Sequence, residues 1–215
     1  MKIGVFDSGL GGKYVADRLG NIFPGDEIIY VNDRHNLPYG DKTAQQIRQL
    51  TALAIQPLLD AGCHAIVIAC NSATTNAIAY LRQQFPETFF IGIEPMIKPA
   101  AKLTTTGKIA VCATPATLAS EGYVRLKDIY ATNLEVIEPD CSTWASLIES
   151  NRSNEIDVAT VGRQLVNQGC DVIVLGCTHY HYLKNRFQAV DSNLKILEPT
   201  DAIANRIANQ LSKVR

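Results

Sequence analysis

The sequence carries one arrangement of motifs twice, and this duplication constrains the fold more than any other feature. Ile3 begins the segment IGVFDSG and Ile109 begins IAVCATP, while Cys70 lies in VIACNS and Cys177 lies in VLGCTH. Position 3 precedes position 70 by 67 residues, and position 109 precedes position 177 by 68 residues. Matching segments at matching separations indicate an internal repeat. We therefore expect two similar structural units, each carrying one of these two cysteines.

Eight short runs rich in β-branched residues predict buried strands. They lie at Lys2–Phe6, Glu27–Val31, Ala65–Ala69, Phe89–Ile93, Lys108–Cys112, Leu134–Ile137, Asp171–Leu175 and Lys195–Leu197. Between several of these runs the apolar residues recur at helical spacing, as at Ile47, Leu50, Ala54 and Leu58, and again at Val158, Val161 and Leu165. Strands that alternate with helices predict an α/β fold with parallel sheets.

The repeat predicts two α/β domains with a cleft between them. We expect the first domain to comprise residues 1–95 and 200–215, because the last helix, with Ile203, Ile207 and Leu211 at helical spacing, returns to it. The second domain is expected at residues 96–199. Ligands of open parallel sheets bind beyond the carboxyl ends of the strands, and Cys70 and Cys177 both follow strands there. The two cysteines are therefore expected to face each other across the cleft.

Composition narrows the class of partner. The 215 residues include 20 Lys and Arg against 21 Asp and Glu, with no block of like charges that would indicate a nucleic-acid or membrane-surface binder. The N-terminal segment lacks the features of a secretory signal, and no apolar run approaches the ~18 residues of a membrane span. We expect a cytoplasmic protein with reduced cysteines that acts on a small polar molecule, without nucleic acid or membrane as partner.

Cys70 and Cys177 are the candidate reactive groups. Each ends a buried strand at a predicted strand-to-helix turn, and Asn71-Ser72 is a capping pair for a helix that runs to about Gln84. The positive end of a helix favours a thiolate, so we expect a lowered pKa for both thiols. His179, two residues after Cys177, could help to deliver a proton. Two opposed acid/base groups suit a reaction that removes a proton from one face of a carbon centre and returns one to the other.

The remaining cysteines and histidines have simpler interpretations. Free cysteines are commonly small buried hydrophobic residues. The spacings give neither the CxxC pairs of a zinc site nor metal-ligating histidine pairs, so no metal is expected. The cysteines interpreted as structural are Cys63, Cys112, Cys141 and Cys170, and the histidines assigned to the surface or to a hydrogen-bonded core are His35, His64 and His181.

Polar residues after the first two strands have two interpretations each. Asp7 and Ser8 could hold a substrate ammonium group or orient Cys70, but Asp-Ser-Gly is also an ordinary turn. Asp33 could assist a base or serve as a turn residue. Gly9, Gly11 and Gly12 lack the Lys-Ser/Thr of a phosphate-binding loop, so close approach of the backbone to a small substrate is the preferred interpretation.

Over nearly its whole length the chain resembles the cofactor-independent glutamate racemases of the aspartate/glutamate racemase group. The resemblance rests on the following segments: Phe6-Asp7-Ser8-Gly9-Leu10-Gly11-Gly12, Leu37-Pro38-Tyr39-Gly40, Ile68-Ala69-Cys70-Asn71-Ser72-Ala73-Thr74, Ala113-Thr114 with Thr117, and Leu175-Gly176-Cys177-Thr178-His179-Tyr180. It implies two flavodoxin-like domains related by a pseudo-twofold axis, no cofactor, and D-glutamate as a product for peptidoglycan synthesis. A homodimer is the assembly to consider.

The resemblance also implies a role for each matching residue. Cys70 and Cys177 would be the two bases, assisted by Asp7 and His179 respectively, with Asp33 and Glu149 as further acidic residues. The substrate-binding residues that it implies are Asp7, Ser8 and Thr178 for the ammonium group, Asn71, Ser72 and Thr117 with Thr114 for the α-carboxylate, and Pro38, Tyr39 and Gly40 for the distal carboxylate.

Several segments depart from the family pattern. Val31–Asn36 carries larger polar residues that we expect beside the distal-carboxylate pocket, and Lys13-Tyr14 adds bulk that could narrow the cleft. Residues 140–144 differ as well, and the chain is short between Glu149 and Asp171. These departures keep two alternatives open: an aspartate racemase and a non-catalytic amino-acid-binding protein. A third alternative is a thiol redox protein or an isomerase that uses one cysteine as a nucleophile.

Overall fold

The computed structural model describes residues 1–211 and contains two four-stranded parallel sheets. The first sheet has the order β2-β1-β3-β4 and the second has the equivalent order β6-β5-β7-β8. The strands are β1 (Lys2–Asp7), β2 (Glu27–Asn32), β3 (Ala65–Ile68), β4 (Phe89–Gly92), β5 (Lys108–Ala113), β6 (Glu135–Ile137), β7 (Val172–Gly176) and β8 (Lys195–Leu197). We call each sheet with its helices the first and the second half. The shared order confirms the internal repeat.

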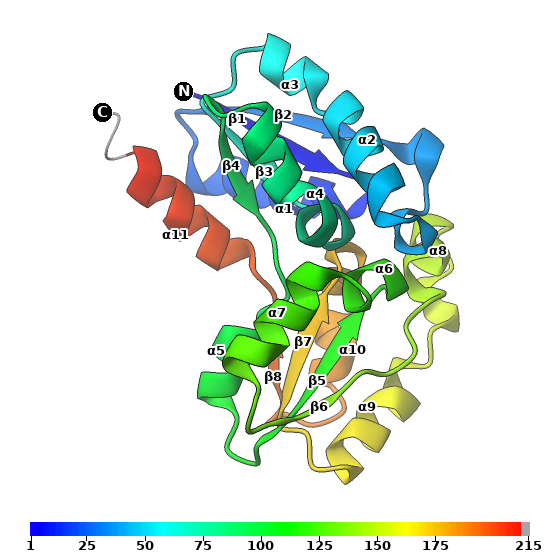
Figure 1. Cartoon of the computed structure of the whole chain (residues 1–215). Coiled ribbons are helices and arrows are strands. Elements are labelled where there is room, and N and C mark those ends of the chain that lie inside the picture. The colour runs from blue at the N-terminus through cyan, green and yellow to red at the C-terminus, as the bar shows by residue number, and fades with distance from the viewer. Residues whose placement is uncertain (212–215) are drawn as a thin grey trace.

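Helices cover both faces of each sheet (Figure 1). In the first half they are α1 (Gly11–Ile22), η1 (Arg34–Asn36), η2 (Tyr39–Asp41), α2 (Ala44–Ala54), α3 (Gln56–Asp60) and α4 (Asn71–Gln84). Along the rest of the chain they are α5 (Ile97–Leu103), α6 (Pro115–Leu118), α7 (Glu121–Tyr130), α8 (Trp144–Glu149), η3 (Ser153–Glu155), α9 (Val158–Asn167), η4 (Thr178–Leu183), α10 (Lys184–Gln188) and α11 (Thr200–Leu211).

Side chains alternate between the two faces of the first sheet and divide its core in two. Ile3 and Val5 of β1 pack with α1, whereas Phe6 packs on the opposite side with Ile66 and Ile68 of β3. All of these side chains are fully buried, as expected for strands that are covered on both faces. At about 25 cal/mol per Å² of apolar surface, this two-sided burial is the main stabilising contribution to each half.

The eight predicted strands are confirmed, with ends that differ by at most one residue. The predicted helix through Ile47 and Leu58 is instead two helices, α2 and α3, which are separated at Ile55. Pro57 explains the break, because its ring lacks the N–H that would continue the helical hydrogen bonds and clashes with the preceding turn. The helix predicted from Val158, Val161 and Leu165 is confirmed as α9.

The C-terminal helix α11 packs against the first sheet. Ile203 and Ile207 lie in the same buried cluster as Ile3, Val5 and Leu19. Figure 1 shows α11 crossing from the second half back to the first half beside β4. This placement is the one that the spacing of the isoleucines predicts. The side chain of Leu211 and residues 212–215, which the predicted first domain includes, lie outside the described residues.

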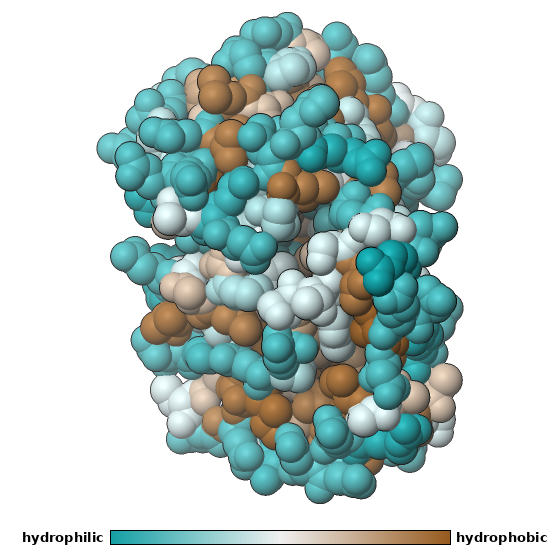
Figure 2. Space-filling model, turned by 90° about the vertical axis from the view of Figure 1, so that its right-hand side faces the viewer, coloured by the Kyte–Doolittle hydropathy of each residue, from teal (hydrophilic) through white to brown (hydrophobic). Residues whose placement is uncertain are grey.

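The two halves approach each other closely where α1 meets η4. A Cβ atom added at Gly11 would lie 2.7 Å from the backbone nitrogen of His179 and closer still to the Thr178 hydroxyl. The space-filling view shows the halves meeting at a waist, with apolar residues in scattered patches on a hydrophilic surface (Figure 2). Within residues 1–211, no helix has the length and apolar character needed to cross a membrane.

Replacement of Gly11 by alanine is expected to force the halves apart and to lower both the melting temperature and the activity. The matched control is Gly20→Ala in the same helix, where the nearest atom to an added Cβ is 3.8 Å away. Alanine there should stabilise the protein by about 0.5–1 kcal/mol, since glycine is unfavourable in a helix interior. Thermal unfolding of both variants checks this, and equal shifts in the two variants would contradict the close contact.

Candidate functional site

A central cavity of about 180 Å³ lies between the carboxyl ends of the two sheets. This volume is below the ~300–1,000 Å³ of pockets for drug-sized ligands, so the cavity suits a small molecule. Twelve of the predicted site residues line it: Ser8, Pro38, Tyr39, Gly40, Cys70, Asn71, Ser72, Thr114, Glu149, Cys177, Thr178 and His179. Cys70 comes from the first half and Cys177 from the second half, and each is almost fully buried.

Cys70 is itself the N-cap of α4. Its sulfur accepts hydrogen bonds from the backbone N–H of Ala73 at 3.4 Å and from the Ser8 hydroxyl at 3.3 Å. Asn71 and Ser72, predicted as the capping pair, instead form the first turn of the helix. The sulfur takes the capping position because β3 ends directly before it and the chain turns into the helix at this residue.

The predicted lowering of the Cys70 pKa is wrong. Burial raises the pKa of the Cys70 thiol to about 12, and the nearby Asp7 carboxylate acts in the same direction. The hydrogen bonds from Ser8 and Ala73 oppose this shift without overcoming it. The favourable helix end was visible in the sequence, whereas the removal of water around the sulfur results from tertiary packing. Cys70 is therefore a thiol at neutral pH.

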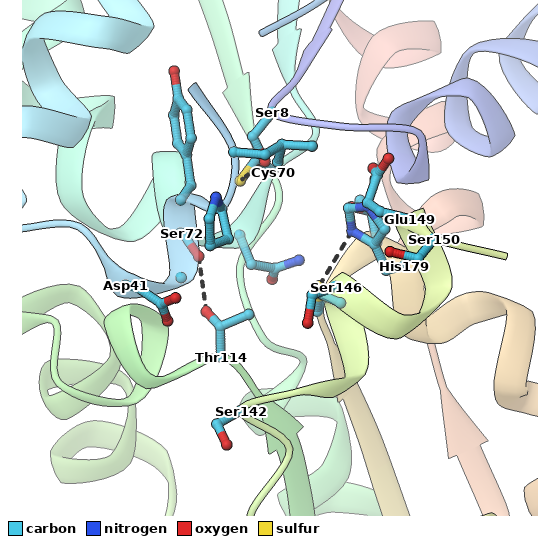
Figure 3. A pocket seen from close by; sticks show the side chains of 18 residues that line it. Ser8, Asp41, Cys70, Ser72, Thr114, Ser142, Ser146, Glu149, Ser150 and His179 are labelled. Carbon is cyan, nitrogen blue, oxygen red and sulfur yellow. Dashed lines mark hydrogen bonds and ion pairs between the residues drawn. The ribbon is translucent and has the colours of Figure 1, made fainter. Parts of the chain in front are cut away.

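Cys177 has a different local setting from Cys70. It is followed by the 3₁₀ helix η4 rather than an α-helix, and its sulfur caps no backbone N–H. The predicted equivalence of the two turns is therefore wrong in this respect. In place of a helix end, the Cys177 sulfur has the His179 imidazole, whose Nδ1 lies 3.7 Å away. Figure 3 shows His179 and Glu149 across the cavity from Ser8 and Cys70.

His179 links Cys177 to an acidic residue. Its Nε2 lies 2.5 Å from Oε1 of Glu149, on the last residue of α8. Burial lowers the pKa of His179, but hydrogen bonds to Cys177 and Glu149 and the charge of Asp7 outweigh burial and raise the pKa to about 10. Burial would raise the pKa of Glu149, but the partners His179, Leu10 and Arg34 lower it. The pair is thus an imidazolium beside a carboxylate at neutral pH.

Asp7 lies behind the cavity wall and joins the two halves. Its carboxylate accepts hydrogen bonds from the Thr178 hydroxyl at 2.9 Å and from the backbone N–H of Gly9 at 2.8 Å. Asp7 is fully buried, and burial raises its pKa although the charge of His179 and these hydrogen bonds oppose the shift. Any contact between Asp7 and a ligand therefore passes through Ser8 or Thr178, which do line the cavity.

Three hydroxyl groups form a cluster at the N-terminus of α4. The hydroxyl of Ser72 lies 2.8 Å from that of Thr114 and 3.2 Å from that of Thr117, so this cluster also spans both halves. Thr117 is fully buried and does not line the cavity. The amide of Asn71 is buried at the cavity wall, and neither its oxygen nor its nitrogen has a hydrogen-bond partner within residues 1–211. This amide is free to bind a polar group in the cavity, whether of a ligand or of water.

Asp33 supports the cavity from outside. It accepts a hydrogen bond from the Tyr39 hydroxyl at 2.7 Å and from the side chain of Asn36 at 2.9 Å. None of residues 31–36 lines the cavity, but Asp33 contacts Tyr39 and Arg34 contacts Glu149, so this segment lies beside the cavity without narrowing it. Tyr14 does not narrow the cavity either, because its ring packs edge-on against His181 and Tyr182.

We predicted that the glycines after β1 let the backbone approach a small substrate, and this prediction is wrong. Space for a Cβ is blocked at Gly9 by Glu149 and His179, at Gly11 by Thr178 and at Gly12 by Asp7. Protein atoms, rather than a ligand, therefore approach this backbone. The segment allows the second half to dock on the first half, which is a non-local requirement that a glycine motif does not reveal.

Six cavity residues were missed by the sequence analysis. They are Leu37, Asp41, Ser142, Ala145, Ser146 and Ser150. The three serines recur every four residues along α8 and its flanks, which places them on one side of the helix (Figure 3). This spacing was the available signal, but α8 has only six residues.

The other cysteines and histidines lie outside the cavity. Cys112, Cys141 and Cys170 are buried in the apolar core of the second half, as predicted, whereas Cys63 is only partly buried. His35 and His64 are exposed as predicted. His181 is buried, but neither ring nitrogen has a hydrogen-bond partner within the described part of the chain, so its assignment to a hydrogen-bonded core is wrong.

A family model and a known protein both match most of the chain in sequence. The family model described as Asp/Glu/Hydantoin racemase matches residues 15–207. The glutamate racemase of Clostridium perfringens (strain 13 / Type A) is 39% identical over 216 residues, which cover 98% of this chain and 83% of that relative.

Two solved structures are also similar. The Escherichia coli glutamate racemase, in complex with L-glutamate and the activator UDP-MurNAc-ala, has a TM-score of 0.85 at 28% identity and is matched over 96% of this chain and 80% of its own. The Francisella tularensis glutamate racemase, in complex with D-glutamate, has a TM-score of 0.82 at 28% identity over 99% of this chain and 81% of its own.

Buried His181 is expected to make the stability of the protein depend on pH. Burial lowers the pKa of His181 to about 4, so between pH 4 and 6.5 the unfolded chain binds a proton that the folded chain does not. Stability is therefore lost as the pH falls through this window. In His181→Phe, the decrease in the free energy of unfolding from pH 7 to pH 5 should be smaller by about 2 kcal/mol.

Denaturant titrations at the two pH values measure this difference. The control is His35→Phe, which makes the same substitution at an exposed histidine. Equal pH dependence in His181→Phe and in the parent protein would show that His181 does not titrate below its ordinary range.

Proposed function

The chain belongs to the Asp/Glu/hydantoin racemase family and is an amino-acid racemase, and we propose that it interconverts L- and D-glutamate without a cofactor. One thiol, as thiolate, takes the hydrogen of the α-carbon as a proton, and the other thiol gives a proton to the opposite face. The observation that carries the proposal is that Cys70 and Cys177 line one small cavity from opposite halves. Each turnover exchanges the protonation states of the two sulfurs.

On the Cys70 side, the reaction requires help from the substrate. A thiol with a pKa of about 12 is protonated at neutral pH, so Cys70 begins as a proton donor and can accept a proton only after it has become a thiolate. A substrate ammonium group beside Ser8 would offset the nearby charge of Asp7 and stabilise a Cys70 thiolate. The hydrogen bonds from Ser8 and Ala73 are already aimed at the sulfur that would become charged. Deprotonation of Cys70 is therefore coupled to substrate binding.

On the Cys177 side, the protein supplies the charge itself. The His179 imidazolium lies 3.7 Å from the sulfur and can donate its Nδ1–H to it. Glu149 holds the ring from the other nitrogen. Preorganised donors and charges of this kind stabilise the charge that develops during proton transfer. The two half-sites thus reach a similar chemical result by different means.

The remaining cavity residues anchor the three charged groups of glutamate. The α-carboxylate would lie against the unpaired amide of Asn71 and the hydroxyls of Ser72 and Thr114, with Thr117 behind them. The N-terminus of α4 adds backbone N–H groups that favour an anion. The ammonium group would lie near Ser8 and Thr178, with Asp7 supplying the negative charge through them, and the distal carboxylate would lie along Pro38, Tyr39 and Gly40.

Glutamate is preferred over aspartate for two reasons. The relatives that match nearly the whole chain are glutamate racemases. In addition, residues 31–36, whose unusual composition raised the aspartate alternative, do not line the cavity. We further propose that the D-glutamate serves peptidoglycan synthesis in the cytoplasm, where thiols stay reduced, and that the protein acts as a homodimer.

Incubation with pure L-glutamate, without added cofactor, is expected to reduce the circular dichroism signal of the amino acid to zero as the racemate forms. L-Aspartate should react at least about 100-fold more slowly, because a side chain one methylene shorter cannot reach Tyr39 and Gly40 from the same anchor. Faster racemisation of aspartate would overturn the substrate assignment. No change with either acid, in folded protein with reduced thiols, would favour a binding protein.

Cys70→Ser and Cys177→Ser are each expected to lower kcat/KM by about 10²–10⁴-fold, the usual contribution of a general acid or base. Serine preserves the size of the side chain, but its hydroxyl is a far weaker acid than a thiol. Cys63→Ser, which changes a cysteine outside the cavity, should retain kcat/KM. Mass spectrometry of the protein with substrate should show no covalent adduct, whereas an adduct on one cysteine would support nucleophilic catalysis instead.

A further inference from the structure

An arginine of the first half reaches the catalytic region of the second half. Arg34 belongs to η1, in the loop that follows β2, and its guanidinium nitrogen lies 3.6 Å from Oε2 of Glu149. The arginine side chain is 54% exposed, while that of Glu149 is 11% exposed. The ion pair therefore joins the solvent-exposed rim of one half to a nearly buried carboxylate of the other half. Neither the sequence motifs nor the cavity lining includes Arg34.

The two oxygens of Glu149 have separate environments. Oε1 lies 2.5 Å from both Nε2 of His179 and the backbone N–H of Leu10. Oε2 is buried and accepts no hydrogen bond within residues 1–211. Arg34 is the only cationic side chain other than His179 that forms an ion pair with Glu149 in the described structure. Without Arg34, Oε2 would be a buried oxygen with no partner of its own among the described residues, and the carboxylate would keep His179 as its only cation there.

This geometry ties His179 to the closure of the cleft. Glu149 lies in the second half, whereas Leu10 and Arg34 both lie in the first half. The carboxylate can therefore be held in its observed orientation only when the halves are together. Since the same carboxylate orients the imidazole beside Cys177, cleft closure and the readiness of that thiol are linked.

We propose that Arg34 is a positioning residue, which holds the Glu149 carboxylate ionised and facing His179 so that Cys177 gains its imidazolium partner only in the closed cleft. The inference rests on the proposed two-thiol reaction. An ion pair with a half-exposed arginine contributes only about 0–1 kcal/mol to stability, so its effect lies in orientation rather than in the strength of folding. Residues 31–36, which depart from the family pattern, would then act through the ion pair between Arg34 and Glu149 rather than by narrowing the space for the substrate.

The charges around Glu149 determine the direction in which the loss of Arg34 should change the pKa of His179. The groups that face Glu149 are Arg34, His179 and the backbone of Leu10, with the hydroxyls of Tyr30 and Tyr182 and the Asp7 carboxylate nearby. Arg34 acts on His179 in two opposite ways. As a distant positive charge it would lower the pKa of His179, but by keeping the carboxylate on Nε2 it raises that pKa.

The test is a pair of NMR and kinetic measurements on Arg34→Gln. If Arg34 positions Glu149, the imidazole of His179 should titrate at least about one pH unit lower in the variant, and kcat should decrease about 10-fold with little change in KM. Arg34→Lys keeps the positive charge and should therefore recover part of the parent pKa of His179 and part of the parent kcat. The chain has four histidines, so their ring signals can be resolved and assigned.

Arg18→Gln is the matched control. Arg18 is 51% exposed and pairs with Asp201 at 3.2 Å, so this change removes the same charge and one cross-element ion pair far from the cavity. An unchanged or raised titration of His179 in Arg34→Gln, or kinetics equal to those of Arg18→Gln, would overturn the inference. The NMR result does not need turnover, and a parent protein that fails to racemise glutamate would overturn the proposed function separately.

The pH profile gives a further measure of the same effect. Arg34 lowers the pKa of Glu149, and activity that needs the carboxylate is lost as the pH falls through that pKa. In Arg34→Gln the acidic limb of the kcat profile should therefore move to higher pH, while Arg18→Gln should keep the limb of the parent protein. A limb at the same pH in all three proteins would contradict a role for Arg34 through Glu149.

Discussion

The hydrogen bond from Thr178 to Asp7 joins two buried residues from opposite halves, and the rest of the site depends on this junction. It fixes the turn after β7 against the turn after β1, so that Cys177 faces the cavity that Cys70 lines from the other side. The glycines of the first turn make the approach possible, because any Cβ at Gly11 would collide with this second turn. Because the same contact buries the site, charged groups there interact more strongly than they would in water.

At this buried junction, the pKa values of two histidines in one turn, His179 and His181, shift in opposite directions. His179 has an anionic partner on Nε2 and a thiol near Nδ1, so its pKa rises to about 10. His181, two residues later, packs edge-on against Tyr14, and neither ring nitrogen has a hydrogen-bond partner within residues 1–211, so burial lowers its pKa to about 4. Burial acts on both residues in the same direction, and the presence or absence of a carboxylate hydrogen bond decides the outcome.

Much of the fold followed from local patterns, and most of what could not be predicted arises between the halves. The β-branched runs located the eight strands, and the repeated cysteine segments located the cavity. Pattern alone could not show that packing would raise the Cys70 pKa, because the burial that raises it arises from tertiary packing. Nor could it pair Arg34 with Glu149, which lies in another half and follows no local rule. The domain boundaries and the role of each site residue remain predictions.

The central claim is that two separate thiols act on opposite faces of one α-carbon. A single-turnover reaction of L-glutamate in D2O, analysed by mass spectrometry before equilibrium, tests it most directly. The account predicts that each molecule of D-glutamate carries one solvent deuterium at the α-carbon, while the remaining L-glutamate keeps its original hydrogen. D-glutamate that retains the original hydrogen, or L-glutamate that exchanges before product forms, would indicate one base and contradict the account.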